Sequence, residues 1–166
     1  DIRAADVIRR LRSILQRGQP VLRPVTPSSL LNNVLRLLKT DLDTSGALVS
    51  KKIPKRLPNF LADRIPVEQV LINLIKNALE AMNENGTRGK SLILSCAAEG
   101  SGVRFSVRDN GCGLPKSGDW IFEAFHTTKP TGLGLGLKIS QTIIQAHGGR
   151  LWAEVNKGRG ASFHFH

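Results

Sequence analysis

Gly132-Leu-Gly-Leu-Gly-Leu-Lys138 is the stretch around which the rest of this chain is organised. Its three glycines alternate with leucines, and an apolar helical pattern follows directly. Glycine allows several backbone N–H groups to converge on one point, and the start of a helix adds partial positive charge there. The stretch is therefore either a phosphate-binding loop or a flexible turn before a helix. It is not a Walker loop, because neither Gly-Lys-Ser nor Gly-Lys-Thr is present.

Composition indicates one compact domain with an appended element. The chain has 166 residues, of which 40% are hydrophobic, so it has enough apolar surface to form a core. No apolar run is long enough to span a membrane, and no signal peptide opens the chain. Cys96 and Cys112 do not form a disulfide framework, and the four histidines lack metal-ligand spacing. We therefore expect a reduced, cytoplasmic setting, with a parent protein that is either soluble or membrane-bound.

The formal net charge of +11 raises the possibility of a nucleic acid, a membrane surface or an anionic ligand as partner. Basic residues concentrate in residues 1–17 and again in residues 51–56. Aromatic residues do not alternate with them, and the chain has no tyrosine. This pattern favours solvated basic faces, and no nucleic-acid partner is expected.

Hydrophobic periodicity and turn residues predict helices and strands in alternation. Thr26 is expected to cap a helix that has Pro27 at its first position. The apolar stripe of this helix is expected to contain Leu30, Leu31, Val34, Leu37 and Leu38. The other expected elements are a helix over 1–18, strands over 21–25 and 47–53, a proline-punctuated connection over 54–66, a helix over 67–83, paired strands over 91–97 and 103–109, a helix over 134–147, and closing strands over about 150–156 and 161–166.

The helix over 67–83 has the strongest pattern. Its apolar residues form one broad face, while Asn73, Asn77 and Glu80 lie on the opposite edge. A neutral amide oxygen is a suitable ligand for a phosphate-bound Mg²⁺, which keeps most of its water. The alternative is an ordinary polar helix edge, which is the usual place for asparagine.

Two further motifs lie between that helix and the glycine-rich stretch. Asp109-Asn-Gly-Cys-Gly113 follows a predicted strand, where its carboxylate could accept a hydrogen bond from an amino group on a flat ligand, or merely order a turn. Phe122 and Phe125 flank Glu123-Ala124 within the irregular stretch 114–131, and we expect them to anchor that loop to the body. Loops of this length in compact domains are usually functional.

Together these motifs resemble those of sensor histidine kinases. Asn73-Leu-Ile-Lys-Asn77-Ala is similar to the asparagine box of that family, and Asp109–Gly113 to its first glycine box. Phe122–Phe125 and Gly132–Leu137 are similar to its phenylalanine box and second glycine box. Four ordered motifs within about 65 residues are far more specific than any one of them. The family belongs to a superfamily that includes gyrase, MutL-type repair proteins and a heat-shock chaperone.

The resemblance implies an α/β (α+β) two-layer sandwich of the Bergerat type, in which a mixed β-sheet packs on three helices. It implies that residues 1–18 are the end of the second helix of a dimerisation and phosphoacceptor domain. Residues 19–166 would then be the catalytic ATP-binding domain, with a lid at about 114–131. No phosphoacceptor histidine motif precedes the domain, so no catalytic residue is expected within this chain.

The resemblance also implies how ATP and Mg²⁺ are held. Asp109 would bind the adenine amino group, Asn77 would hold Mg²⁺, and residues 132–137 would cradle the phosphates. Glu80 and Ala81 stand where many of these kinases carry a basic or aromatic residue, so this chain departs from the family there. The expected ATP-binding residues are Asn73, Asn77, Glu80, Ala81, Asp109, Gly111, Gly113, Leu114, Thr128, Lys129, Gly132, Leu133, Gly134, Gly136 and Leu137.

By this resemblance the chain would supply the γ-phosphoryl group of ATP to a histidine of its own dimerisation domain, for relay to a response regulator. The full-length protein would be a homodimer. One alternative is an ATPase of the same superfamily, and another is a non-catalytic nucleotide-binding or basic interaction module. Position 73 separates the first two, because the hydrolytic relatives carry a glutamate base where this chain has Asn73. An amide cannot take a proton from water.

Overall fold

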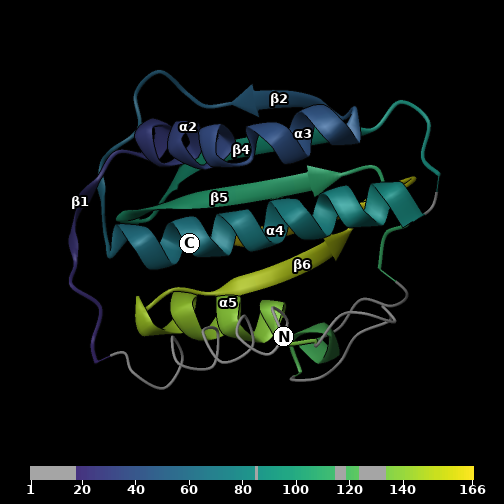
Figure 1. The fold of residues 1–166 in the computed structure, drawn as a ribbon. Helices are drawn as coiled ribbons and strands as arrows, with labels where there is room; N and C mark the ends of the chain where they lie inside the picture. Colours follow the sequence, from purple (N-terminus) through teal and green to yellow (C-terminus); the bar gives the residue numbers. More distant parts are fainter. Residues whose placement is uncertain (1–17, 85, 115–118, 124–133) are drawn as a thin grey trace, which may run out of the picture.

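The computed structural model describes residues 18–84, 86–114, 119–123 and 134–166 (Figure 1). The expected helix over 1–18 lies almost wholly outside these residues, as does most of the expected lid. The elements, in chain order, are β1 Arg23–Val25, α2 Pro27–Leu37, α3 Lys39–Ser45, β2 Leu48–Lys52, β3 Phe60–Ala62, α4 Arg64–Glu84, β4 Ser91–Glu99, β5 Gly102–Asp109, the short 3₁₀ helix η1 Asp119–Phe122, α5 Gly136–Ala146, β6 Leu151–Val155 and β7 Ala161–Phe165.

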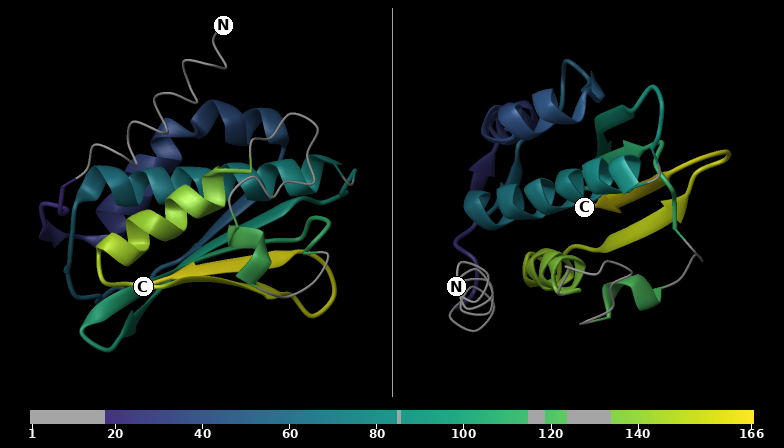
Figure 2. Two further views of the ribbon diagram at one scale, coloured as in Figure 1. Left: turned by 90° about the horizontal axis from the view of Figure 1, so that it is seen from below. Right: turned by 45° about the vertical axis from the view of Figure 1, so that its right-hand side comes forward.

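The main sheet has five strands in the order β2-β4-β5-β7-β6. Strands β2 and β4 are parallel, and the other neighbours are antiparallel, so the sheet is mixed. Helices α2, α4 and α5 lie on one side of it, as the two views of Figure 2 show. The expected two-layer sandwich is confirmed. The short α3 continues α2 beyond Leu38, where the helix is interrupted.

The core lies between the two layers. In β5, Val103, Phe105 and Val107 are buried, as the alternation of their sequence predicts. They face α4, whose apolar face is almost completely buried. Phe105 has its ring stacked on Phe165 of β7 at 5.0 Å and meets the edge of Phe60 at 5.3 Å. Central strand β5 is thereby fixed against β3 and against its sheet neighbour β7, and its last residue is Asp109.

A two-stranded antiparallel sheet of β1 and β3 was not expected from the sequence. Strand β3 and the first turn of α4 occupy the region that prolines suggested was a connection. Two details of α2 also differ. Leu37, the last residue of α2, is 55% exposed and does not belong to the apolar stripe. Thr26 precedes the helix as expected, but its hydroxyl donates a hydrogen bond to Asn59 Oδ1 (3.1 Å) instead of capping.

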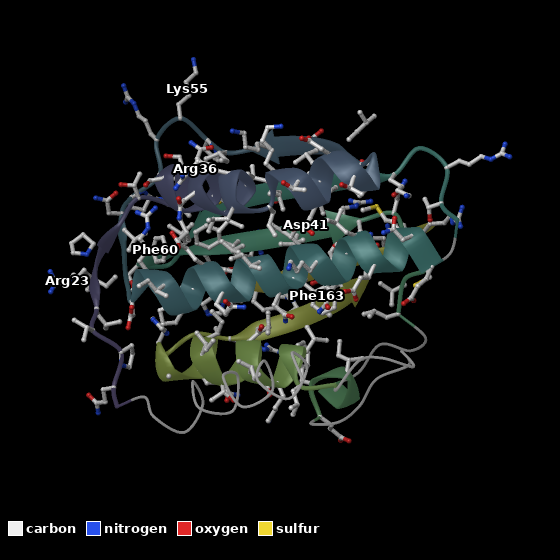
Figure 3. The ribbon with its side chains drawn as sticks, viewed as in Figure 1. Arg23, Arg36, Asp41, Lys55, Phe60 and Phe163 are labelled. Carbon is white, nitrogen blue, oxygen red and sulfur yellow. The ribbon has the colours of Figure 1, made fainter. Side chains whose placement is uncertain are left out.

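Edge strand β2 is exposed along all five residues, including Lys51 and Lys52. Lys55 and Arg56, which follow it, are exposed as well. The side chains of Lys55 and Arg23 extend from the edge of the molecule (Figure 3). This agrees with the solvated basic faces that the composition indicates. Among the helices in the described ranges, none combines the length and apolar character that a membrane span needs.

Candidate functional site

The candidate site is built on Asp109, at the end of β5. Its side chain is buried, with the residue only 4% exposed. Carboxylate oxygen Oδ1 accepts hydrogen bonds from the backbone N–H groups of Gly111 (2.8 Å) and Ala161 (3.4 Å). Burial raises the pKa of the Asp109 carboxyl, and the two backbone hydrogen bonds oppose that rise. A further donor on a ligand would therefore stabilise the ionised form.

The loop after Asp109 is attached to the end of α4. Cys112 donates its backbone N–H to the carbonyl oxygen of Ala81 (3.3 Å), which brings Gly111 beside this helix, whereas Gly113 lies beside Gly160 in the turn between β6 and β7. Leu114 is half-buried and packs against the core. The structure therefore brings Gly111 of the first glycine box together with Ala81.

Asn110 holds the same loop from the other side, a role that the sequence did not suggest. Its Oδ1 accepts a hydrogen bond from the backbone N–H of Ser91 (2.9 Å), and its Nδ2 donates one to the carbonyl of Gly89 (2.9 Å). The signal available in the sequence was weak, because an Asn after a strand end is common in ordinary turns.

Asn73 connects the two helices that border the site. Its Nδ2 donates a hydrogen bond to the hydroxyl of Ser140 on α5 (3.0 Å). Its side chain also abuts the first residue of α5, since a Cβ added at Gly136 would lie 2.6 Å from Asn73 Oδ1. Glycine at that position allows the start of α5 to approach α4, so that the two expected motifs meet.

Asn77 lies one turn further along α4 and is half-buried. Among the described residues its amide makes no hydrogen bond, so its oxygen remains available as a ligand. The same part of the chain has no group of three or more His, Cys, Asp or Glu side chains that could hold a metal ion. A single amide oxygen fits Mg²⁺ that is carried mainly by phosphates and water, as Mg²⁺ usually is.

Only the end of the glycine-rich stretch is described. Gly136 is the first residue of α5, which confirms that the stretch opens a helix, and Leu135 before it is buried. Gly134 precedes them, and Leu137 packs against the core. The first turn of α5 also carries Lys138, so this helix start is suited to an anion. The expected site residues Thr128, Lys129, Gly132 and Leu133 lie outside the described residues.

The other expected features near the site are partly described. Phe122, the last residue of η1, is buried, so it anchors the loop as expected, whereas Phe125 lies outside the described part. Glu80 is exposed on α4.

His147 and His164 are half-buried and make hydrogen bonds within the fold. His147 ends α5, where its Nδ1 bonds the carbonyl of Ile143 (2.8 Å) and its Nε2 accepts a hydrogen bond from the backbone N–H of Asp63 (3.0 Å). His164 stacks on Trp152 and bonds the Ser106 hydroxyl through Nδ1 (2.7 Å), and burial lowers its pKa. His126 lies outside the described residues. The rings of His147 and His164 therefore do not resemble an exposed phosphoacceptor, whereas His166 is exposed and meets the edge of the Trp152 ring at 5.7 Å.

Residues 62–166 match the family described as histidine kinase-, DNA gyrase B- and HSP90-like ATPases. The chain is 37% identical over 164 residues to the sensor histidine kinase TmoS of Ectopseudomonas mendocina, covering 97% of this chain and 17% of that protein. It is 37% identical over 169 residues to the sensor protein FixL of Bradyrhizobium diazoefficiens, covering 99% and 32%. The chain therefore spans less than a third of the length of either relative.

Solved structures give the same result. Full-length ShkA in complex with AMPPNP has a TM-score of 0.79 at 32% identity, with 96% of this chain and 34% of ShkA covered. The nucleotide-free catalytic domain of histidine kinase ThkA has a TM-score of 0.77 at 30% identity, with 87% and 93% covered. The chain belongs to the family of histidine kinase-, DNA gyrase B- and HSP90-like ATPases, and within it to the ATP-binding domains of sensor histidine kinases.

Proposed function

We propose that this domain binds Mg²⁺-ATP and supplies the γ-phosphoryl group to a histidine on its own dimerisation domain. The buried carboxylate of Asp109, beside the junction of β5 and α4, is the observation that carries the proposal. An acceptor held in that position recognises the amino group of adenine. The nucleotide analogue AMPPNP in the related ShkA structure supports ATP as the ligand.

The chemistry required of the domain is positioning and charge neutralisation, as in other phosphoryl transfers. Asp109 fixes the base, and the start of α5 at Gly136 directs backbone N–H groups toward the phosphates. Mg²⁺, when bound through Asn77 and the phosphates, would neutralise charge on the transferring group. The expected phosphate contacts at Thr128, Lys129, Gly132 and Leu133 complete this proposal.

Asn73 favours the kinase over a hydrolytic ATPase of the same superfamily. Its Nδ2 already donates a hydrogen bond to the Ser140 hydroxyl, and its amide oxygen cannot remove a proton from water. Direct transfer to a histidine needs no such base, because the acceptor nitrogen is itself the nucleophile.

The partners of the parent protein belong to the same proposal. Residues 1–18 would end the second helix of the dimerisation domain, and residues 19–166 form the catalytic domain. A related structure holds histidine kinase ThkA with the response regulator TrrA, with a TM-score of 0.76 at 26% identity. We therefore propose a response regulator as the final phosphoryl acceptor and a homodimeric, cytoplasmic kinase unit. No nucleic-acid partner is proposed.

Mg²⁺-ATP is expected to stabilise the fold, because a ligand that binds only the folded state shifts the unfolding equilibrium. At a free concentration 100 times the dissociation constant, the gain should be about 2.7 kcal/mol. A thermal-melt series with increasing Mg²⁺-ATP measures this, and Mg²⁺ alone is the control. A melting temperature that stays constant up to millimolar Mg²⁺-ATP would contradict nucleotide binding, and would favour the non-catalytic interaction module.

Asp109→Asn tests the site itself. The ionised carboxylate only accepts hydrogen bonds, whereas guanine presents a carbonyl where adenine presents an amino group. We therefore expect the native chain to prefer ATP over GTP by roughly ten- to hundredfold. The amide of the variant donates as well as accepts hydrogen bonds. ATP binding should therefore weaken, and the preference for ATP over GTP should become smaller. Calorimetric titration of both nucleotides against both proteins measures the ratio, and an unchanged ratio would remove Asp109 from base recognition.

A further inference from the structure

The turn between β6 and β7 lies against the backbone of Asp109, although it is remote in sequence. Asn156 is half-buried in this turn, and its Nδ2 donates a hydrogen bond to the carbonyl oxygen of Asp109 (2.9 Å). Ala161, the first residue of β7 after this turn, donates its backbone N–H to Asp109 Oδ1 (3.4 Å). The β6–β7 hairpin therefore holds both the main chain and the side chain of the residue on which the proposed base recognition depends.

The orientation of the Asn156 amide is fixed by a second contact. The hydroxyl of Ser162, which is buried, donates a hydrogen bond to Asn156 Oδ1 (2.6 Å). Since a hydroxyl donor satisfies the oxygen, the nitrogen is directed to the Asp109 carbonyl. Asn156 also closes its own turn, because its backbone N–H donates to the carbonyl of Gly160 (3.2 Å). The amide is thus fixed by the turn before any ligand arrives.

We infer that Asn156, oriented by Ser162, is a positioning residue that sets the direction of the Asp109 carboxylate and thereby the selectivity for adenine. The inference rests on the proposed role of Asp109. Asn156 itself acts on the peptide of Asp109 and is not assigned a contact with the nucleotide. The neighbouring Ala161 N–H keeps Oδ1 engaged, which leaves the other carboxylate oxygen for the base.

Asn156→Asp is the variant that tests this inference. It keeps the size of the side chain and the oxygen that accepts from Ser162, but it replaces the donor facing the carbonyls of Asp109 (2.9 Å) and Arg159 (3.4 Å) with a negatively charged acceptor. ATP affinity should fall about five- to thirtyfold, because the Asp109 carbonyl loses its donor and faces an acceptor instead. GTP affinity should fall less, so the ratio of ATP affinity to GTP affinity should decrease. Calorimetric titration with each nucleotide gives the ratio, and an unchanged ratio would overturn the inference.

Two further variants make the test specific. Lys157→Ala removes an exposed charge in the same turn, and it should leave the ratio of ATP affinity to GTP affinity at the native value. Ser162→Ala removes the hydroxyl that orients the Asn156 amide, so the amide can rotate. It should also decrease the ratio of ATP affinity to GTP affinity, by a smaller factor than Asn156→Asp does. If Asn156→Asp does not fold, as judged by thermal melting, Ser162→Ala decides the question, and a native ratio in that variant would overturn the inference.

A double-mutant cycle separates this inference from the proposed function. In the Asp109→Asn background, Asn156→Asp should produce no further change in the ratio, because both act through one carboxylate. If Asp109→Asn decreases the ratio of ATP affinity to GTP affinity but Asn156→Asp does not, only the positioning role of Asn156 is wrong. If neither changes the ratio, base recognition by Asp109 is wrong, and the positioning role falls with it.

Discussion

Gly160→Ala should lower the free energy of unfolding by about 2–5 kcal/mol. Gly160 has φ +87°, a left-handed conformation that is costly for alanine. An added Cβ would also lie 2.6 Å from the carbonyl carbon of Asp109 and 2.7 Å from the Cα of Asn110. Backbone cannot yield as a flexible side chain does, so either the turn or the end of β5 must move. Guanidinium denaturation of the native and variant chains measures the difference.

Gly158→Ala is the matched control. Gly158 lies in the same turn with φ +107°, but a Cβ there would meet no atom within 4 Å. This variant should lose only the conformational cost of about 1–2 kcal/mol. If the two variants unfolded at the same denaturant concentration, the close approach of Gly160 to β5 would have no energetic importance. Nucleotide affinity should also weaken in Gly160→Ala alone, since only that change displaces Asp109.

Phe105→Ala should destabilise the fold by about 3–5 kcal/mol, as is usual when a buried phenylalanine is removed. Phe105 is 1% exposed at the centre of the main sheet, and its ring contacts Phe60 and Phe165. Alanine would leave a cavity between the layers and remove both aromatic contacts. Equilibrium denaturation by urea measures the loss.

Leu48→Ala is the control variant for Phe105→Ala. Leu48 is 73% exposed on edge strand β2, so its truncation should change the free energy of unfolding by no more than about 0.5 kcal/mol. A loss at Phe105 as small as this would mean that the core repacks around the cavity, contrary to the rigid packing expected between these layers.

Elements with a strong local pattern could be predicted from the sequence. Strand β5 alternates apolar and polar residues, and α4 carries a continuous apolar face, so both were expected close to their observed bounds. Helix α4 begins at Arg64, earlier than the expected start at residue 67, and Pro66 lies in its first turn. Proline is tolerated there, since the first N–H groups of a helix have no partner within it.

Features that depend on distant partners could not be predicted. Strand β3 has three residues, and its pairing with β1 joins segments that no local pattern relates. The residues of the candidate site likewise include some that the sequence predicts and some that it does not. Its motif residues were expected, but the contribution of Asn156 was not, because its contact with Asp109 spans 47 positions. A single Asn before a Lys-Gly-Arg-Gly turn has no periodicity that could indicate this contact.

The dependence of Asp109 on the β6–β7 turn has a consequence for biosynthesis. A ribosome makes Asp109 well before Asn156, Gly160 and Ala161, because synthesis runs from the N-terminus. While the nascent chain lacks these residues, β5 has no β7 beside it, and the carboxylate has one of its two backbone donors, the N–H of Gly111. The proposed site for the base therefore forms only after residue 161 has been made, and nascent chains halted before residue 156 should not be retained on immobilised ATP.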